Sequence, residues 1–486
     1  MAVHKRFPLV VAVIAILAVF TGCGGGGNSL SFPPPQGNFT NASLSGPFAF
    51  SYTGSDARGF LAVAGSFQAD GAGHITSGMQ DINSGFGIST NSPITGTYAV
   101  RADGRGSANL NSPAGNSVID FVIVAGGHAL ITRFDANASG SGTIDLQTTS
   151  AFSNAALAGT FAFNLAGIDA IGNPIAVAGN LTSDATGNIT SGVDDSNDNG
   201  GVITNDPLTG SIPVASTGRG TATVNTIRGT LTFTYYVVDA THLKLVEIDN
   251  TLVLGGEAFR QTGPFTNASV SGPFAFTLAG ADALSAGPFA AGGVLSSNGA
   301  GTVTSGTEDF NDAGTVTQNV GLTGNYSMAA NGRGTLTITT GAGTFNFVIY
   351  PSSGGVQVLE TDIRFVTTGI ALQQQTTPFT ASAFGGSYGL NFTGVTTSGE
   401  VDAIAQLTSD GASVTNGIID LNNVGGITFG QPLTGTYQMA ANGRAPLTLQ
   451  TPLGTQNMVM YMVNSNRALF VELNSTLVAA GDLRHQ

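Results

Sequence analysis

The sequence repeats itself four times, with a period of about 113 residues. An Ile/Leu-Thr-Gly segment at residues 94–96 returns at 208–210, 322–324 and 433–435. Each copy of this segment is followed by an arginine, and successive arginines are separated by 114, 114 and 111 residues. This period is too long for a short-repeat solenoid, so we expect four modules, each with its own hydrophobic core.

The residues within each repeat favour short strands joined by tight turns. Glycine accounts for 70 of the 486 residues, and charged residues make up only 9% of the chain. Glycine and β-branched residues weaken helices, while Asp-Gly and Asn-Gly pairs stand at the expected hairpin turns. With about eight sequential strands per repeat, we expect an all-β fold in which each module is an eight-stranded up-and-down barrel. A two-sheet β-sandwich is the alternative.

The first strand of each repeat begins with a glycine motif. Its four copies are Gly46-Pro47-Phe48, Gly159-Thr160-Phe161, Gly272-Pro273-Phe274 and Gly386-Ser387-Tyr388. The motif resembles the Gly-x-Trp opening of lipocalin- and avidin-like barrels, with Phe or Tyr in place of Trp. The resemblance implies an up-and-down barrel.

The N-terminus has the pattern of an export signal. Basic residues at 4–6 precede an apolar run at 7–20, and Phe20-Thr21-Gly22-Cys23 follows. This segment resembles the lipobox of bacterial lipoprotein signal peptides, with Phe20 at the position where Leu is usual. The resemblance implies cleavage before Cys23, acylation of Cys23 with fatty acids such as palmitate, and a membrane anchor in the bacterial cell envelope, at the outer membrane or cell surface rather than the inner membrane. An ordinary secretory signal with an incidental cysteine, or an uncleaved anchor, is the alternative.

Short polar joints set the expected domain limits. The predicted segments are a signal peptide (1–22), a lipidated tether rich in Gly and Pro (23–40) and four β modules (41–148, 154–262, 267–375 and 381–486). Such joints are too short for independent tumbling, so we expect a semi-rigid string of modules.

Two charged positions recur in all four copies. An aspartate begins an Asp-x-Asn motif, and an arginine follows 24 residues later, giving the pairs Asp81 and Arg105, Asp195 and Arg219, Asp309 and Arg333, and Asp420 and Arg444. Because this offset is constant while other loop lengths change, we expect each aspartate to form a structural ion pair with the arginine of its own copy. A repeated ligand site made of the same side chains is the alternative.

The second module contains a candidate calcium loop at residues 195–206. Asp195, Asn197, Asn199 and Asp206 occupy positions 1, 3, 5 and 12 of a twelve-residue loop with Gly200 at position 6. The segment resembles the loops of EF-hand and dockerin modules, although the flanking helices are missing and Asp stands in place of the usual Glu. A hairpin turn rich in Asp and Asn is the alternative, and no other cofactor is expected.

Composition narrows the function classes. A net charge of −14 without a basic stripe excludes nucleic acid as a partner. None of the five histidines recurs at an equivalent position in all four copies, and the G-x-S-x-G string at 385–389 lacks the helix that a nucleophile elbow requires. We therefore expect a non-enzymatic surface lipoprotein with a structural, adhesive or matrix-contact role and an extracellular partner. An array of barrels that bind small apolar ligands is the alternative, and an enzyme is the third class.

Cys23→Ser tests the anchor. We expect the variant to accumulate as unprocessed precursor and to incorporate no labelled fatty acid, because the thiol is the acylation site. Processing and labelling that persist in the variant would contradict the lipoprotein interpretation.

Overall fold

The computed structural model describes residues 37–486 except 126, 376–377 and 425. All of these residues belong to one unit, Pro34–Gln486. Cys23, the predicted signal peptide and most of the predicted tether lie outside the described residues. Among the residues that are described, no helix is both long and apolar enough to cross a membrane.

The first two repeats form barrels 1 and 2, each preceded by one or two short helical turns. Barrel 1 comprises η1 (Asn41–Ser43), β1 (Ser45–Asp56), β2 (Gly59–Asp70), β3 (His74–Ser84), β4 (Gly87–Pro93), β5 (Thr95–Val100), β6 (Arg105–Asn111), β7 (Ser117–Val124), β8 (His128–Asp135) and β9 (Ala138–Leu146). Barrel 2 comprises η2 (Thr149–Ala151), α1 (Asn154–Leu157), β10 (Gly159–Asp169), β11 (Pro174–Ser183), β12 (Asn188–Asp198), β13 (Gly201–Pro207), β14 (Thr209–Ser211), β15 (Arg219–Thr226), β16 (Gly229–Asp239), β17 (His242–Glu247) and β18 (Leu252–Gln261).

The last two repeats form barrels 3 and 4. Barrel 3 comprises η3 (Asn267–Val270), β19 (Ser271–Asp282), β20 (Gly287–Asn298), β21 (Thr302–Asp312), β22 (Thr315–Met328), β23 (Gly334–Thr340), β24 (Gly343–Ser352), β25 (Gly355–Glu360) and β26 (Phe365–Gln373). Barrel 4 comprises η4 (Ala381–Phe384), β27 (Gly385–Thr396), β28 (Gly399–Asp410), β29 (Ser413–Asn423), β30 (Gly426–Pro432), β31 (Thr434–Tyr437), β32 (Arg444–Thr451), β33 (Gly454–Asn464), β34 (Arg467–Glu472) and β35 (Leu477–His485).

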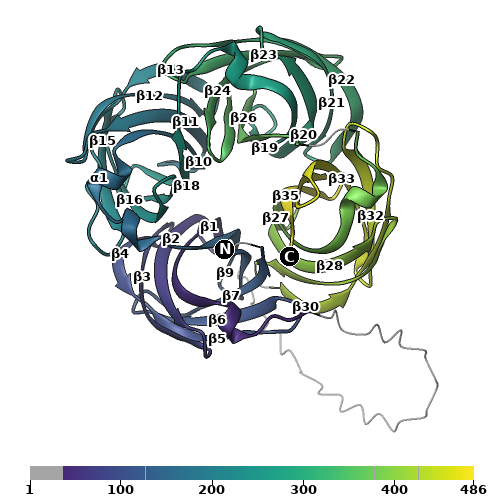
Figure 1. Cartoon of the computed structure of the whole chain (residues 1–486), viewed down its shortest axis with the longest axis horizontal. Helices are drawn as coiled ribbons and strands as arrows, with labels where there is room; N and C mark the ends of the chain where they lie inside the picture. The colour runs from purple at the N-terminus through teal and green to yellow at the C-terminus, as the bar shows by residue number, and fades with distance from the viewer. Residues whose placement is uncertain (1–36, 126, 376–377, 425) are drawn as a thin grey trace, which may run out of the picture. The chain divides into compact units, whose positions relative to one another are not determined.

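Each repeat is a closed, antiparallel, up-and-down barrel (Figure 1). Consecutive strands pair with one another, and the last strand returns to the first, as β9 does to β1. Barrel 3 has eight strands. In the other three barrels the fourth strand is interrupted and counts as two, for example β4 and β5, which both pair with β3. The predicted barrel fold is therefore confirmed, and the sandwich alternative is excluded.

Two ends of each barrel are distinguished by the chain path. In barrel 1 the turns β1–β2, β3–β4, β6–β7 and β8–β9 lie at one end, which we call the hairpin end. The chain enters and leaves each barrel at the opposite end, which we call the joint end. At the start of the described chain, the backbone N–H of Phe39 donates to the carbonyl of Ala102 in a joint-end turn, at 3.3 Å. The predicted tether is therefore attached at the joint end of barrel 1.

Strands between barrels are buried on both faces. In β33, Met458 and Met460 point into the core of barrel 4, whereas Val459 and Tyr461 pack against Val294 of barrel 3. This explains why the sequence of β33 is an almost unbroken apolar run rather than an alternating one. Similar apolar clusters join barrel 1 to barrel 2, barrel 2 to barrel 3, and barrel 4 to barrel 1.

Candidate functional site

The recurring aspartates lie in the contacts between barrels. Asp195 of β12 is fully buried and receives two hydrogen bonds from Arg333 of barrel 3, Nε to Oδ2 at 2.8 Å and Nη2 to Oδ1 at 2.6 Å. The hydroxyl of Tyr350 and the backbone N–H of Asn205 also donate to this carboxylate. A buried carboxylate requires such a complete set of donors, and the planar guanidinium supplies two of them in fixed geometry.

The same cluster is repeated in two further contacts. Asp81 accepts from Arg219 and Tyr236 of barrel 2, with the Arg219 Nη2 at 2.7 Å from Oδ1. Asp309 accepts from Arg444 and Tyr461 of barrel 4, with the Tyr461 hydroxyl at 2.8 Å from Oδ2. In each cluster the aspartate belongs to one barrel, and the arginine and tyrosine belong to the next.

The contact between barrels 4 and 1 is looser. Nη1 of Arg105 is 3.6 Å from Oδ2 of Asp420, and its Nε donates instead to Asp103 at 3.0 Å. Val122 occupies the position that holds the tyrosine in barrels 2, 3 and 4. This contact joins the first and last barrels of the chain.

The expected ion pairs within each copy are wrong. All eight predicted residues take part in ion pairs, but every arginine pairs with the aspartate of another barrel: Arg219 with Asp81, Arg333 with Asp195, Arg444 with Asp309 and Arg105 with Asp420. The physical reason is that the aspartate lies on the flank of its barrel that faces the next barrel, while the arginine lies on the flank that faces the previous one. Their constant offset reflects the common scaffold and not a direct contact.

The asparagine of each Asp-x-Asn motif forms a second repeated contact, at the hairpin end. Nδ2 of Asn197 donates to the carbonyls of Glu360, Asp362 and Phe365, at 2.9–3.1 Å, and so holds the turn between β25 and β26. Asn83, Asn311 and Asn422 hold the equivalent turns of barrels 2, 4 and 1.

A glutamine at the end of the last strand of each barrel forms a third contact, at the joint end. Gln261 donates to Pro351 O at 2.8 Å, and Gln486, the last residue of the chain, donates to Asp103 O at 2.8 Å and Ile123 O at 3.0 Å. Hairpin ends are thus in contact with hairpin ends, and joint ends with joint ends. Because barrel 4 also contacts barrel 1, the contacts close into a cycle, so the string of modules expected from the sequence is closed on itself.

The predicted calcium ligands belong to the hairpin of β12 and β13. Asp195 is engaged by Arg333, and the Nδ2 of Asn197 by carbonyls of barrel 3. Asn199 has a positive φ of 49° in the turn, and Asp206 accepts from the backbone N–H of Ile227 at 2.8 Å. No group of three or more His, Cys, Asp or Glu side chains within the described part of the chain is arranged to hold a metal ion. Calcium binding stays a prediction, and it would require Asp195 to exchange Arg333 for the ion.

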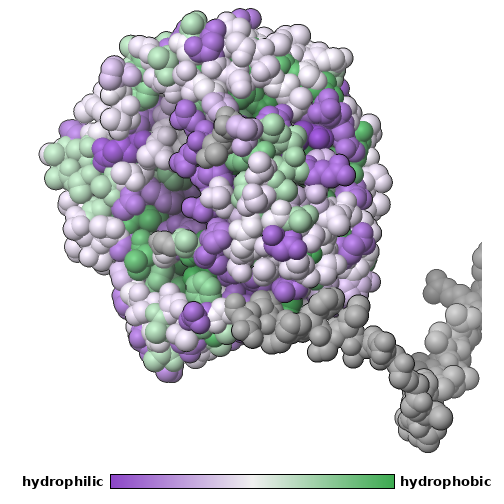
Figure 2. All heavy atoms as spheres, turned by 45° about the vertical axis from the view of Figure 1, so that its right-hand side comes forward, coloured by the Kyte–Doolittle hydropathy of each residue, from purple (hydrophilic) through white to green (hydrophobic). Residues whose placement is uncertain are grey.

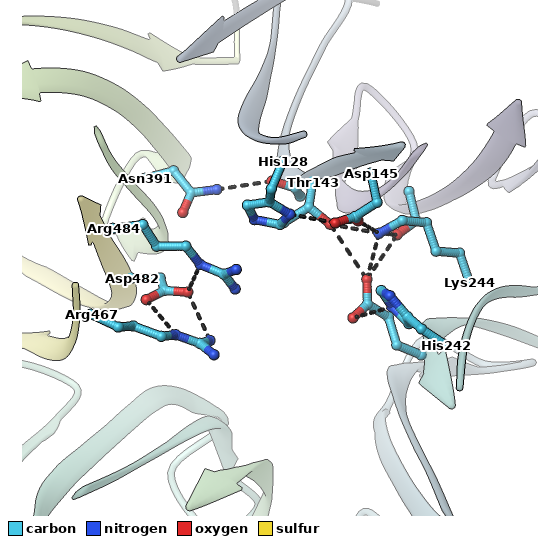
Figure 3. Close-up of polar contacts among 12 residues, drawn as sticks. His128, Thr143, Asp145, His242, Lys244, Asn391, Arg467, Asp482 and Arg484 are labelled. Atoms are coloured by element: carbon cyan, nitrogen blue, oxygen red, sulfur yellow. Dashed lines mark hydrogen bonds and ion pairs between the residues drawn. The ribbon is translucent and has the colours of Figure 1, made fainter. Parts of the chain in front are cut away.

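A charged cluster that the sequence analysis missed surrounds Lys244 (Figure 3). Lys244 of β17 is fully buried, and its Nζ lies 2.7 Å from Oε1 of Glu257 and 2.8 Å from Oδ2 of Asp145 in barrel 1. It also donates to the hydroxyl of Thr143, and Asp145 is paired with His128. Burial alone would lower the pKa of Lys244, but the two carboxylates outweigh burial and raise it. Barrels 1 and 2 are therefore tied together through a lysine that is charged at neutral pH.

Barrel 4 contributes a second charged group to the same region (Figure 3). Asp482 of β35 pairs with Arg467 at 2.8 Å and with Arg484 at 2.7 Å. Burial would raise the pKa of Asp482, but the two guanidinium groups lower it, so that the carboxylate stays ionised. Burial and the charge of Arg484 lower the pKa of His128.

Sequence signals for some of the missed residues exist. Lys244 is the only lysine after the N-terminal segment and stands between two leucines. Tyr236, Tyr350 and Tyr461 recur with the same spacings as Arg219, Arg333 and Arg444, namely 114 and 111 residues. The residues around Asp482 recur in no other copy, so the repeat gives no signal for them.

Exposed apolar side chains collect at the hairpin end. Within the part of the chain that the structure describes, nine large hydrophobic side chains are exposed, and eight of them lie in or close to hairpin-end turns. They include Ile171 (83% exposed), Ile227 (75%), Leu284 (75%) and Ile363 (71%), while Leu146 is at the joint end. In Figure 2, hydrophobic residues form green patches on a surface that is otherwise pale or purple.

Comparisons with known proteins give no family. No family model matches the chain, and no curated sequence matches it. Among solved structures, a double mutant of transferrin binding protein B, a vaccine antigen from Haemophilus parasuis, is 9% identical, with a TM-score of 0.21 over 75% of this chain and 82% of that chain. A single mutant of the same protein is 9% identical, with a TM-score of 0.20 over 96% and 98%. A DUF3598-family protein of unknown function from Nostoc punctiforme is 7% identical, with a TM-score of 0.16 over 91% and 97%. Scores this low support no conclusion about function.

Arg333→Met tests the partner of the recurring arginine. It leaves the buried carboxylate of Asp195 without its counter-charge, and we expect the free energy of unfolding of residues 28–486, measured in urea, to fall by about 3–5 kcal/mol. Asp195→Asn should cost much less in the Arg333→Met background than alone, by more than about 1 kcal/mol, because the two side chains interact. Asp309→Asn, the control from the same copy as Arg333, should be additive with Arg333→Met. If Arg333→Met were additive with Asp195→Asn and coupled to Asp309→Asn, the pairing between barrels would be contradicted.

The buried glutamates at the hairpin end predict an unusual pH dependence. Burial raises the pKa of Glu360 and of Glu472 to about 8. Above the pKa of His128, at pH 6.5–8.5, the folded chain holds protons that the unfolded chain has lost, so the free energy of unfolding decreases as pH rises. We expect the thermal midpoint to fall between pH 6.5 and 8.5, and Glu360→Gln with Glu472→Gln to flatten this fall. Asp410→Asn, in an exposed turn, is the control and should leave the slope unchanged.

Proposed function

We propose that the chain is a non-enzymatic lipoprotein of the bacterial cell envelope, anchored through Cys23, whose role is adhesion to an apolar extracellular surface or matrix. Its partners in this proposal are the membrane, through the lipid, and the surface contacted by the hairpin ends of the barrels. The anchoring membrane is the outer membrane, with the barrels at the cell surface.

The observation that carries the proposal is the polarity of the barrels. The tether is attached at the joint end of barrel 1, and the exposed apolar side chains gather at the hairpin ends. Joint ends adjoin joint ends and hairpin ends adjoin hairpin ends in neighbouring barrels. The exposed apolar side chains at the hairpin ends, which we call the tips of the barrels, are thus available at the end opposite to the anchor.

Multivalency gives such a surface its strength. Burial of one exposed isoleucine or leucine contributes about 1.5–3 kcal/mol, which alone gives only a weak contact. Four linked barrels contact a surface together, so that each later contact is intramolecular and the weak contacts reinforce one another. Because the net charge is −14, the chain is repelled by anionic target surfaces, and apolar contact is the main attraction.

A tip variant tests the proposal. In Ile171→Ser, Ile227→Ser, Leu284→Ser and Ile363→Ser combined, the altered side chains are exposed, so folding should be retained. We expect cells that display this variant to attach to a hydrophobic surface at least about tenfold less than cells with the wild-type chain, since each 1.4 kcal/mol lost is a factor of ten in affinity. Attachment is counted after washing, with equal surface display verified by antibody.

Leu146→Ser at the joint end is the matched control and should leave attachment unchanged. Equal attachment of the tip variant and the wild-type chain, or an equal loss with Leu146→Ser, would contradict the adhesive role.

A further inference from the structure

The interior of barrel 3 contains a cavity of about 130 Å³. The corresponding cavities in barrels 2 and 1 are about 60 Å³ and about 10 Å³. Most of the lining in barrel 3 is apolar, with aromatic rings such as Phe276, Phe289 and Phe347. The cavity reaches the hairpin end, where the half-exposed Arg364 belongs to its lining and pairs with Asp282 and Asp312. A ligand could thus enter the cavity from the hairpin end.

Two inward positions explain the differences in volume. In barrel 3 the first position is Val358, which lies opposite a glycine of the last strand. The second position is Ala371, on the last strand itself. The equivalent pairs of residues are Ile131 and Ile144 in barrel 1, Leu245 and Ala258 in barrel 2, and Phe470 and Leu483 in barrel 4. In barrel 4 both side chains belong to the core. Among barrels 1, 2 and 3, barrel 3 has the smallest pair of side chains and the largest cavity.

The lining of the barrel 3 cavity includes three acidic side chains. Asp312 pairs with Arg364, while Glu308 and Glu360 have no cationic partner among the lining residues. Glu360 is 2% exposed and accepts a hydrogen bond from the hydroxyl of Thr367 at 2.7 Å. Burial raises the pKa of Glu360 to about 8, and burial together with the charge of Asp309 raises that of Glu308 to about 7. At pH 6 these two groups are therefore largely uncharged carboxylic acids, which donate a hydrogen bond as well as accept one. In barrel 4, Ile419 stands at the position of Glu308.

We propose that barrel 3 binds one small, uncharged aromatic or alicyclic molecule with a hydrogen-bond-accepting oxygen directed at Glu308 or Glu360. An apolar cavity of roughly 150 Å³ accommodates benzene in another protein, so the volume here fits a single ring. A charged ligand would lose its hydration without gaining a counter-ion, because the acids are neutral and Arg364 is already paired. This binding site is independent of the adhesive surface, which requires only the exposed tips.

Binding is tested with two probes on residues 28–486, which include every described residue. Acetophenone has a ring and an accepting carbonyl, and toluene has the ring alone. At pH 6 we expect calorimetry to show a single site for acetophenone and binding at least about tenfold weaker for toluene. Absence of acetophenone binding at millimolar concentration would overturn the proposal.

Variants that fill the cavity of one barrel show which barrel binds the ligand. Val358→Phe with Ala371→Leu introduces the side chains that barrel 4 holds at the same register, and we expect it to abolish acetophenone binding while the chain retains its thermal midpoint. Should this pair not fold, Ala371→Leu alone serves the same purpose with half the added volume. The matched control, Leu245→Phe with Ala258→Leu, fills barrel 2 and should leave binding intact. Unchanged binding in the barrel 3 variant, or loss in the control alone, would overturn the assignment.

Glu308→Ile tests the polar contact. It replaces the acid with the residue of barrel 4, and we expect the preference for acetophenone over toluene to shrink towards one. Glu360→Gln, which keeps a hydrogen-bond donor, should preserve the preference at pH 6 and retain more of it at pH 9 than the wild-type chain does. An unchanged preference in the double variant Glu308→Ile with Glu360→Leu, which removes both donors, would show that the acids do not contact the ligand and would overturn that part of the proposal.

Discussion

Buried aspartates on the flanks of the barrels determine how the barrels assemble. Removal of a carboxylate from water costs several kcal/mol unless hydrogen bonds and a counter-charge replace the solvent. An isolated barrel 2 could not meet this demand at Asp195, because the guanidinium of Arg333 and the hydroxyl of Tyr350 both belong to barrel 3. Each barrel thus has a closed sheet and a core of its own, but its flank is complete only beside the next barrel.

The cycle is weakest where the ends of the chain meet. In three contacts the aspartate accepts two hydrogen bonds from an arginine and one from a tyrosine. In the fourth, Nη1 of Arg105 is 3.6 Å from Oδ2 of Asp420, and its Nε donates to Asp103 instead. Polar contacts from the last barrel compensate in part: Asn422 holds a turn of barrel 1, and Gln486 donates to two of its carbonyls. In three of the contacts a covalent joint keeps the two barrels near each other, and here none does. Opening of the cycle should therefore begin between barrels 4 and 1.

The sequence predicts the barrels well and their assembly poorly. The repeat, the strand-rich composition and the turn dipeptides indicate four up-and-down barrels, because these features are local. The partner of each arginine is not local. The offset from Asp195 to Arg219 is the same in all four copies. The offset from Asp195 to Arg333 is nearly as regular, at 138 residues in two contacts and 135 in the contact between barrels 3 and 4. A repeated spacing cannot decide between a contact within one copy and a contact with the next. The recurrence of Tyr350 in three copies is a signal for a buried cluster, but the sequence analysis did not use it.

Alternation along the strands allows the four barrels to differ inside while they assemble alike outside. Successive side chains of a strand point to opposite faces, so Asp309 faces barrel 4 while its neighbour Glu308 faces the interior. The outward position is aspartate in all four copies. The inward position is Gln80 in barrel 1, Asp194 in barrel 2, Glu308 in barrel 3 and Ile419 in barrel 4. A change of an inward residue leaves the contacts between barrels in place, so the cavity of one barrel can gain volume and polar groups without disturbing the cycle. Repetition therefore fixes the assembly, and the interior of each barrel is the part that is free to acquire a separate ligand.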